Sequence, residues 1–160
     1  MNERGLLWLF NETLSFKQIP PPMDYEAFGK MLLSCANGDG RIAPDERAWV
    51  IGFLDAYGAP AQLLETLKTY AGTDDLTKLV EASPTVKMSA TSALYDAVRA
   101  CMADGELAPG ETAALEKAAA ALGLDKSVVG ELVKLYRDER DLRERRLRAI
   151  FPKGIPFQGN

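Results

Sequence analysis

Apolar residues along this chain recur three and four positions apart, the spacing that places side chains on one face of an α-helix. Proline or glycine separates most of the resulting stripes, as at Pro84, Gly58 and Gly123. The pattern predicts an all-α protein, a compact bundle of about seven to eight helices. The stripes occupy residues 3–16, 25–35, 49–57, 63–70, 76–80, 86–101, 111–122 and 128–136. Thr73 is expected to cap the short helix at 76–80.

An eight-residue motif occurs twice. Asp39-Gly40-Arg41-Ile42-Ala43-Pro44-Asp45-Glu46 returns as Asp104-Gly105-Glu106-Leu107-Ala108-Pro109-Gly110-Glu111, and the same spacing relates Gly58 to Gly123. Each copy reads as the turn of a helical hairpin, in which Asp-Gly ends one helix and Pro with Glu opens the next. Two copies are too few for a solenoid, so we expect two hairpin units packed about a pseudo-twofold axis.

The repeat divides the chain into three parts. A helical strap and a proline linker, Pro20 to Pro22, occupy residues 1–22. The helical domain is expected at 23–150, with repeat one at 23–71 and repeat two at 86–136, and residues 151–160 form a C-terminal tail.

Composition and charge narrow the function classes. The net charge of −4 argues against general binding to a phosphate backbone, so nucleic acid is not expected as a partner. The chain contains no histidine, which excludes Ser-His-Asp, Cys-His and histidine-based zinc chemistry.

Cys35 and Cys101 are expected to be buried free thiols. The apolar run from Leu6 to Phe10 is too short to span a bilayer and lacks a cleavage site, so a cytoplasmic protein without a membrane span is expected.

The acids of the repeated turn are candidate metal ligands. Asp39, Gly40, Ile42 and Glu46 fit the fifth, sixth, eighth and twelfth positions of an EF-hand loop, but Cys35 stands at the first, where a carboxylate is needed. Convergence of the two turns would bring together four acids that select Ca²⁺, Mg²⁺ or Mn²⁺. Hydrogen bonds within the turns and helix capping could equally explain every repeated residue. The four candidate ligands are Asp39, Glu46, Asp104 and Glu111.

The last helix ends in a charged rod, residues 137–148. Its six arginines outnumber its four acids, and one interpretation is a basic docking surface formed by Arg140, Arg143 and Arg146. A solvated helix end, stiffened by ion pairs four residues apart, is the other interpretation.

The second motif, from Ala103 to Glu111, with the alanine-rich helix and Leu122-Gly123-Leu124-Asp125 that follow it, resembles the tellurite-resistance TerB-like family. The first copy resembles the first half of the same family, and the likeness covers residues 25–136. Two departures stand out. Alanine replaces the usual Ser or Thr before each proline, and Gly110 replaces an acidic residue.

The resemblance implies an all-helical bundle of about seven helices without established enzymatic activity. It also implies a role in bacterial tellurite and chemical-stress responses, and it gives the four acids a candidate metal role. The expected function is therefore a non-enzymatic stress-associated module that acts through protein partners or self-association and binds a divalent cation. A purely structural or oligomerising module without metal is the alternative, with Leu6 to Phe10 and Phe151 to Phe157 as contact surfaces. A carboxylate-metal hydrolase is a further one, for which the sequence lacks a phosphate loop or nucleophile motif.

Overall fold

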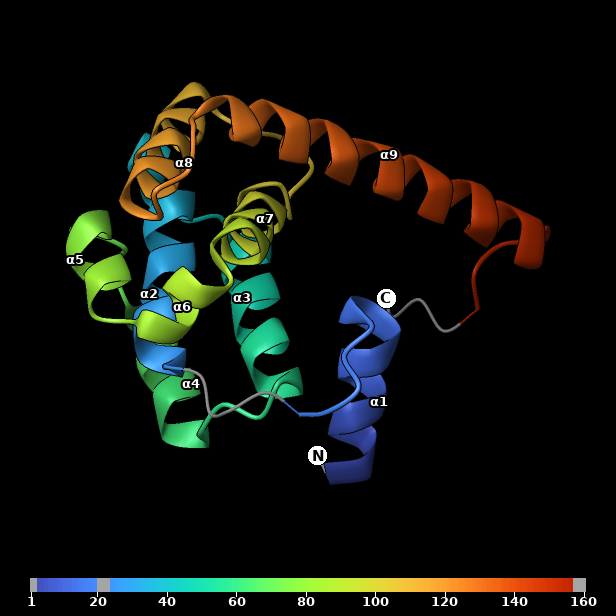
Figure 1. Cartoon of the computed structure of the whole chain (residues 1–160). Helices are drawn as coiled ribbons and strands as arrows, with labels where there is room; N and C mark the ends of the chain where they lie inside the picture. Colours follow the sequence, from blue (N-terminus) through green and yellow to red (C-terminus); the bar gives the residue numbers. More distant parts are fainter. Residues whose placement is uncertain (1–2, 20–23, 157–160) are drawn as a thin grey trace.

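The computed structural model describes residues 3–19 and 24–156, and every element of secondary structure within these ranges is a helix (Figure 1). This confirms the all-α prediction. No helix in the described ranges combines the length and the hydropathy needed to cross a membrane. The elements are α1 (Glu3–Leu14), α2 (Tyr25–Ala36), the 3₁₀ turn η1 (Asn37–Asp39), α3 (Pro44–Ala56), α4 (Ala61–Thr69), α5 (Leu76–Glu81), α6 (Pro84–Met88), α7 (Ala90–Cys101), α8 (Pro109–Ala121) and α9 (Ser127–Ile150).

Helix α2 is the centre of the bundle. It packs against α3, α4, α5, α7 and α8, and most of its side chains are buried. Gly29 lets two neighbouring helices approach, because a Cβ added there would lie 2.7 Å from Leu54 Cδ1 and 2.9 Å from Leu67 Cδ1. The alanine-rich α8 crosses α2 and also contacts α5, α7 and α9. The core is thus built around the helix that enters the first repeated turn.

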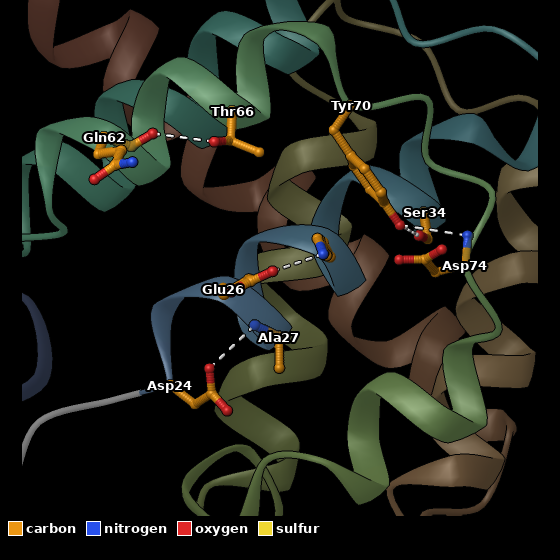
Figure 2. Close-up of polar contacts among 9 residues, drawn as sticks. Asp24, Glu26, Ala27, Ser34, Gln62, Thr66, Tyr70 and Asp74 are labelled. Atoms are coloured by element: carbon orange, nitrogen blue, oxygen red, sulfur yellow. Dashed lines mark hydrogen bonds and ion pairs between the residues drawn. The ribbon is translucent and has the colours of Figure 1, made fainter.

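Polar contacts fix both ends of α2 (Figure 2). Asp24 caps its first turn, where the carboxylate accepts a hydrogen bond from the Ala27 N–H at 3.2 Å. Nearer the other end, the Tyr70 hydroxyl lies 3.1 Å from Ser34 Oγ and accepts a hydrogen bond from the Asp74 N–H at 3.3 Å. The loop between α4 and α5 is therefore tied to α2 immediately before the first turn.

Nine α-helices lie within the described residues, which exceeds the predicted seven to eight. The predicted stripe at 86–101 is divided in two, because Ser83 caps a separate short helix and the non-helical dihedral angles of Ser89 end it.

The cap of α5 is Asp75, which accepts hydrogen bonds from the Thr77 and Lys78 N–H groups. Thr73 was expected to take that role. The proline linker and Phe157 lie outside the described residues, and the pseudo-twofold relation stays a prediction.

The first and last helices extend beyond the central bundle. Helix α1 lies beside α3, where Phe10 packs edge to face on Tyr57 with ring centroids 4.8 Å apart. Helix α9 begins against α7 and α8, and its second half projects past the body of the protein (Figure 1). Because that half covers no core, its side chains are free to face solvent or a partner.

Candidate functional site

The two repeated turns lie directly against each other. A Cβ added to Gly110 would lie 2.3 Å from the Gly38 carbonyl oxygen, and one added to Gly38 would lie 2.4 Å from the Gly110 carbonyl oxygen. Real side chains do not tolerate such separations, so glycine on both sides is what allows the two backbones to touch. The contact joins η1 to the first turn of α8.

Each turn is held by its own aspartate. Asp39 Oδ1 accepts a hydrogen bond from the Arg41 N–H, and Asp104 Oδ1 accepts one from the Glu106 N–H, both at 3.0 Å. The glycine after each aspartate adopts positive φ, +90° in the first turn and +105° in the second. The predicted turn chemistry is therefore present in both copies, and both aspartates remain exposed.

The two glutamates point inward from the starts of α3 and α8. Glu46 Oε2 accepts a hydrogen bond from the Ala43 N–H, and Glu111 Oε2 accepts one from the Ala108 N–H, both at 2.6 Å. A carboxylate is favoured at this end of a helix, where free N–H groups and the helix dipole are positive. Unusually for carboxylates, both side chains are buried, with 3% and 4% exposed. Capping therefore explains one oxygen of each glutamate but not its burial.

A cavity of about 380 Å³ opens between the turns. Its walls contain all four acids that the sequence marked as candidate ligands. They also contain Glu106, which the sequence did not mark, and Arg41 is the one basic residue among them. The cavity is lined by Asp39, Arg41, Ala43, Glu46, Asp104, Glu106, Leu107, Ala108, Pro109 and Glu111.

The electrostatics of the glutamate pair favour a shared proton in the metal-free protein. Burial, together with the hydrogen bond that its protonated carboxyl makes to Glu111, raises the pKa of Glu46 to about 8. Burial also raises the pKa of Glu111, with the negative charges of Asp39 and Asp104 adding to the effect. Two buried carboxyls within hydrogen-bonding reach of each other cannot both ionise without a cost in free energy. The pair therefore holds one proton near neutral pH.

Glu111 Oε1 is buried and has no hydrogen-bond donor among the described groups, apart from a proton on Glu46. A bound cation, in place of that proton, would also satisfy Glu111 Oε1. No three Asp, Glu, Cys or His side chains in residues 3–19 and 24–156 lie close enough to bind one metal ion directly. The carboxylate oxygens of the lining nevertheless fit a hard cation that keeps much of its own water, as Mg²⁺ usually does.

Cys35 and Cys101 are buried and unpaired behind this cavity, as the sequence predicted. Burial raises the pKa of the Cys35 thiol to about 12, with a further contribution from the negative charge of Glu111. The pKa of Cys101 is raised for the same main reason. Because the thiolate is the reactive form, neither thiol suits reductive chemistry in the folded state.

We therefore expect both thiols of the folded protein to react with iodoacetamide at least about 100-fold more slowly than in denaturant at the same pH. Mass spectrometry of time-quenched samples gives the rate for each cysteine. Rapid labelling of Cys35 or Cys101 in protein that circular dichroism shows to be folded would contradict this expectation.

The three candidate docking arginines line a second hollow, of about 570 Å³, between α9 and the α3 and α7 helices. Arg140 is half-buried and donates a hydrogen bond to the Met102 carbonyl oxygen at 3.1 Å, so it ties α9 to the second turn. Arg143 and Arg146 are exposed. Trp49 and Arg99 form the opposite wall. Their part could not be read from the sequence, because it depends on how α3 and α7 pack beside α9.

The whole chain is similar to a tellurite resistance protein from Nostoc punctiforme whose crystal structure is known. The two chains are 35% identical, the match covers 97% of each, and the TM-score is 0.84. The chain belongs to the TerB-like tellurite-resistance family. No protein-family model and no curated protein matches the sequence.

Family membership confirms the resemblance carried by the repeated turns, and it extends beyond them. The match to the Nostoc protein covers nearly the whole TerB-like chain, whereas the motif likeness covered residues 25–136. Because so little of the chain falls outside this match, most of α1 and α9 belongs to what the chain shares with the Nostoc protein. The sequence also gave no role to Gly38 and Gly110, although a glycine in each turn was a usable signal of close backbone approach.

Proposed function

We propose that this chain is a non-enzymatic TerB-like module linked to tellurite or chemical stress, which binds a divalent cation between its two turns and acts through a protein partner. The observation that carries the cation site is the pair of buried glutamates, Glu46 and Glu111, converging on one acidic cavity. There Glu111 Oε1 has no donor among the described groups other than a proton on Glu46. Asp39 and Asp104, at the cavity rim, supply further negative charge and accept hydrogen bonds from bound water.

The chemistry of the cavity selects the kind of ion. Carboxylate oxygens without imidazole or thiolate ligands favour Ca²⁺, Mg²⁺ or Mn²⁺ over zinc or copper. The cation would take the place of the proton that the two glutamates otherwise share, and it would balance the acids of both turns at once. Binding would then stabilise the contact between the turns, because the ion belongs to neither hairpin alone.

We assign no reaction to this module. The chain has no histidine to act as a general base, and both its thiols are buried. The connection to tellurite resistance rests on the similarity to the Nostoc protein. A structural module without metal is the competing function, and it is favoured by the fact that Oε2 of each glutamate already caps its own helix.

The test is a calorimetric titration of metal-stripped protein with Ca²⁺, Mg²⁺ and Mn²⁺. We expect one cation to bind, and the Glu46→Gln, Glu111→Gln double variant to lose at least about tenfold in affinity while staying helical. Asp45→Asn is the matched control, because Asp45 is an exposed acid beside Glu46 that does not line the cavity. Absence of binding in the parent protein would leave the turns as structural elements only.

A further inference from the structure

A groove runs along one side of α9 and continues towards α1. Its first part is the hollow of about 570 Å³ that contains Arg143 and Arg146, and its second part is a hollow of about 390 Å³ beside α3. The two parts meet at Trp49 and Arg99, which line both. We call the whole the α9 groove. Its first part is lined by Trp49, Arg99, Tyr136, Glu139, Arg140, Leu142, Arg143 and Arg146.

The first part of the α9 groove is strongly basic, although the chain as a whole carries a net charge of −4. Four arginines line it beside a single acid, Glu139, whose carboxylate accepts a hydrogen bond from the Tyr95 hydroxyl at 2.6 Å. Positive charge is thus concentrated on one face of an acidic protein, which indicates a binding surface for a negatively charged ligand.

Two of the four arginines already have partners within the protein. Arg140 binds the Met102 carbonyl oxygen, and Arg99 pairs with Asp96 at 3.2 Å and lies 5.0 Å from the centroid of the Trp49 ring. Arg143 and Arg146 make no hydrogen bond or ion pair with any residue that the structure describes. Their guanidinium groups remain available to an anionic ligand.

The second part of the groove is mainly apolar. Ala48, Phe53 and Ala56 of α3 face Leu9 of α1 there. Trp49, partly exposed and stacked on Phe53 at 5.0 Å, forms the boundary between the basic and apolar parts. A ligand that fills the whole groove must therefore carry negative charge at one end and apolar surface at the other.

The dimensions favour a peptide. From Tyr136 to Arg146 the wall formed by α9 rises about 15 Å, which matches about five residues of extended chain. A nucleic acid would bring its phosphates close to the acidic turn of Asp104 and Glu106, next to which Arg140 is held. The apolar part would also have no use in binding a phosphate backbone.

We propose that the α9 groove binds an acidic segment of a partner protein, with carboxylates on Arg143 and Arg146 and an apolar side chain beside Trp49. The inference rests on the proposed function in that it supplies the partner through which the module acts. It is independent of the cation site, because the two surfaces share no lining residue.

The probe is a fluorescein-labelled synthetic peptide of about ten residues with glutamates at one end and Leu and Phe at the other. Fluorescence anisotropy measures its affinity for the full chain. We expect Arg143→Glu with Arg146→Glu to weaken binding at least about tenfold. Arg145→Glu with Arg148→Glu is the control, because it makes the same charge change on another face of α9, outside the groove, and is expected to weaken binding less than about threefold.

Further probes test each end of the groove. A peptide with serines in place of Leu and Phe should bind at least about tenfold more weakly, and one with lysines in place of the glutamates should not bind. In a Trp8→Phe background, where Trp49 is the remaining tryptophan, the intact probe should change the tryptophan fluorescence. The substitution is mild because Trp8 is 65% exposed.

Four outcomes would overturn the inference. They are no binding of the acidic probe, equal weakening by the two arginine pairs, tighter binding of a single-stranded oligonucleotide than of the probe, and no effect of removing Leu and Phe. Circular dichroism shows whether the Arg143→Glu, Arg146→Glu variant is folded, and calorimetry with Mn²⁺ shows whether its cation site is intact. Failure of the peptide test with intact cation binding would count against this inference alone, and failure of cation binding in the parent would count against the cation site alone.

Discussion

Gly110→Ala is expected to lower the stability of the protein by about 3 kcal/mol, or its melting temperature by roughly 10 °C. The added Cβ would lie 2.3 Å from the Gly38 carbonyl oxygen and 2.9 Å from Asp39 Cα. Since these are backbone atoms, no side-chain rotation can relieve the overlap, and the two turns must separate. Thermal unfolding followed by circular dichroism gives the measurement.

Gly52→Ala is the matched control for that substitution. Gly52 lies within α3, and an added Cβ there would meet no atom within 4 Å. Alanine is favoured over glycine in a helix interior by about 0.5–1 kcal/mol, so this variant should be slightly more stable than the parent. If Gly110→Ala behaved like the control, the close contact between the turns described above would be wrong.

The second large effect concerns pH. We expect the metal-free protein to lose on the order of 3 kcal/mol of stability as the pH rises from about 5 to about 9. The pKa of Glu46 is about 8 in the folded protein, against an ordinary value of 4.5. Between these values the folded state binds more protons than the unfolded state. The stabilisation is therefore complete below about 4.5 and is lost as the pH passes through about 8.

Glu46→Gln separates this effect from other titrations. The raised pKa of Asp96, about 6 because of burial, acts in the same direction and remains in the variant. The amide keeps a hydrogen bond donor towards Glu111 and cannot lose a proton, so the loss of stability above about pH 6 should be largely abolished. Urea unfolding at several pH values gives the comparison. An unchanged pH dependence in the variant would show that the two glutamates do not share a proton.

Much of the fold could be predicted from sequence because its signals are local. The apolar spacing located α2, α3 and α8, and Pro44, Gly58 and Gly123 marked helix ends by their own backbone preferences. The predicted start of a helix was less accurate where several neighbouring residues could act as its N-terminal cap. Asp75, two residues after the expected Thr73, caps α5 because its carboxylate reaches two N–H groups.

The candidate site was only partly accessible from sequence, because its key properties arise from tertiary contacts. The repeat marked Glu46 and Glu111, but their burial against each other depends on the packing of η1 on α8. Arg41 and Glu106 stand at equivalent positions of the two motifs, and only the structure shows that these opposite charges line one cavity. The groove beside α9 likewise depends on Trp49 and Arg99, which come from distant parts of the chain.

The central claim is that a divalent cation displaces the proton shared by Glu46 and Glu111. The most direct measurement is the number of protons released when Mn²⁺ binds near pH 7, obtained by calorimetry in buffers of different ionisation enthalpy. We expect about one proton to be released for each cation bound, and no release in the Glu46→Gln, Glu111→Gln variant. Cation binding without proton release, or the same release in the double variant, would place the cation elsewhere and contradict the claim.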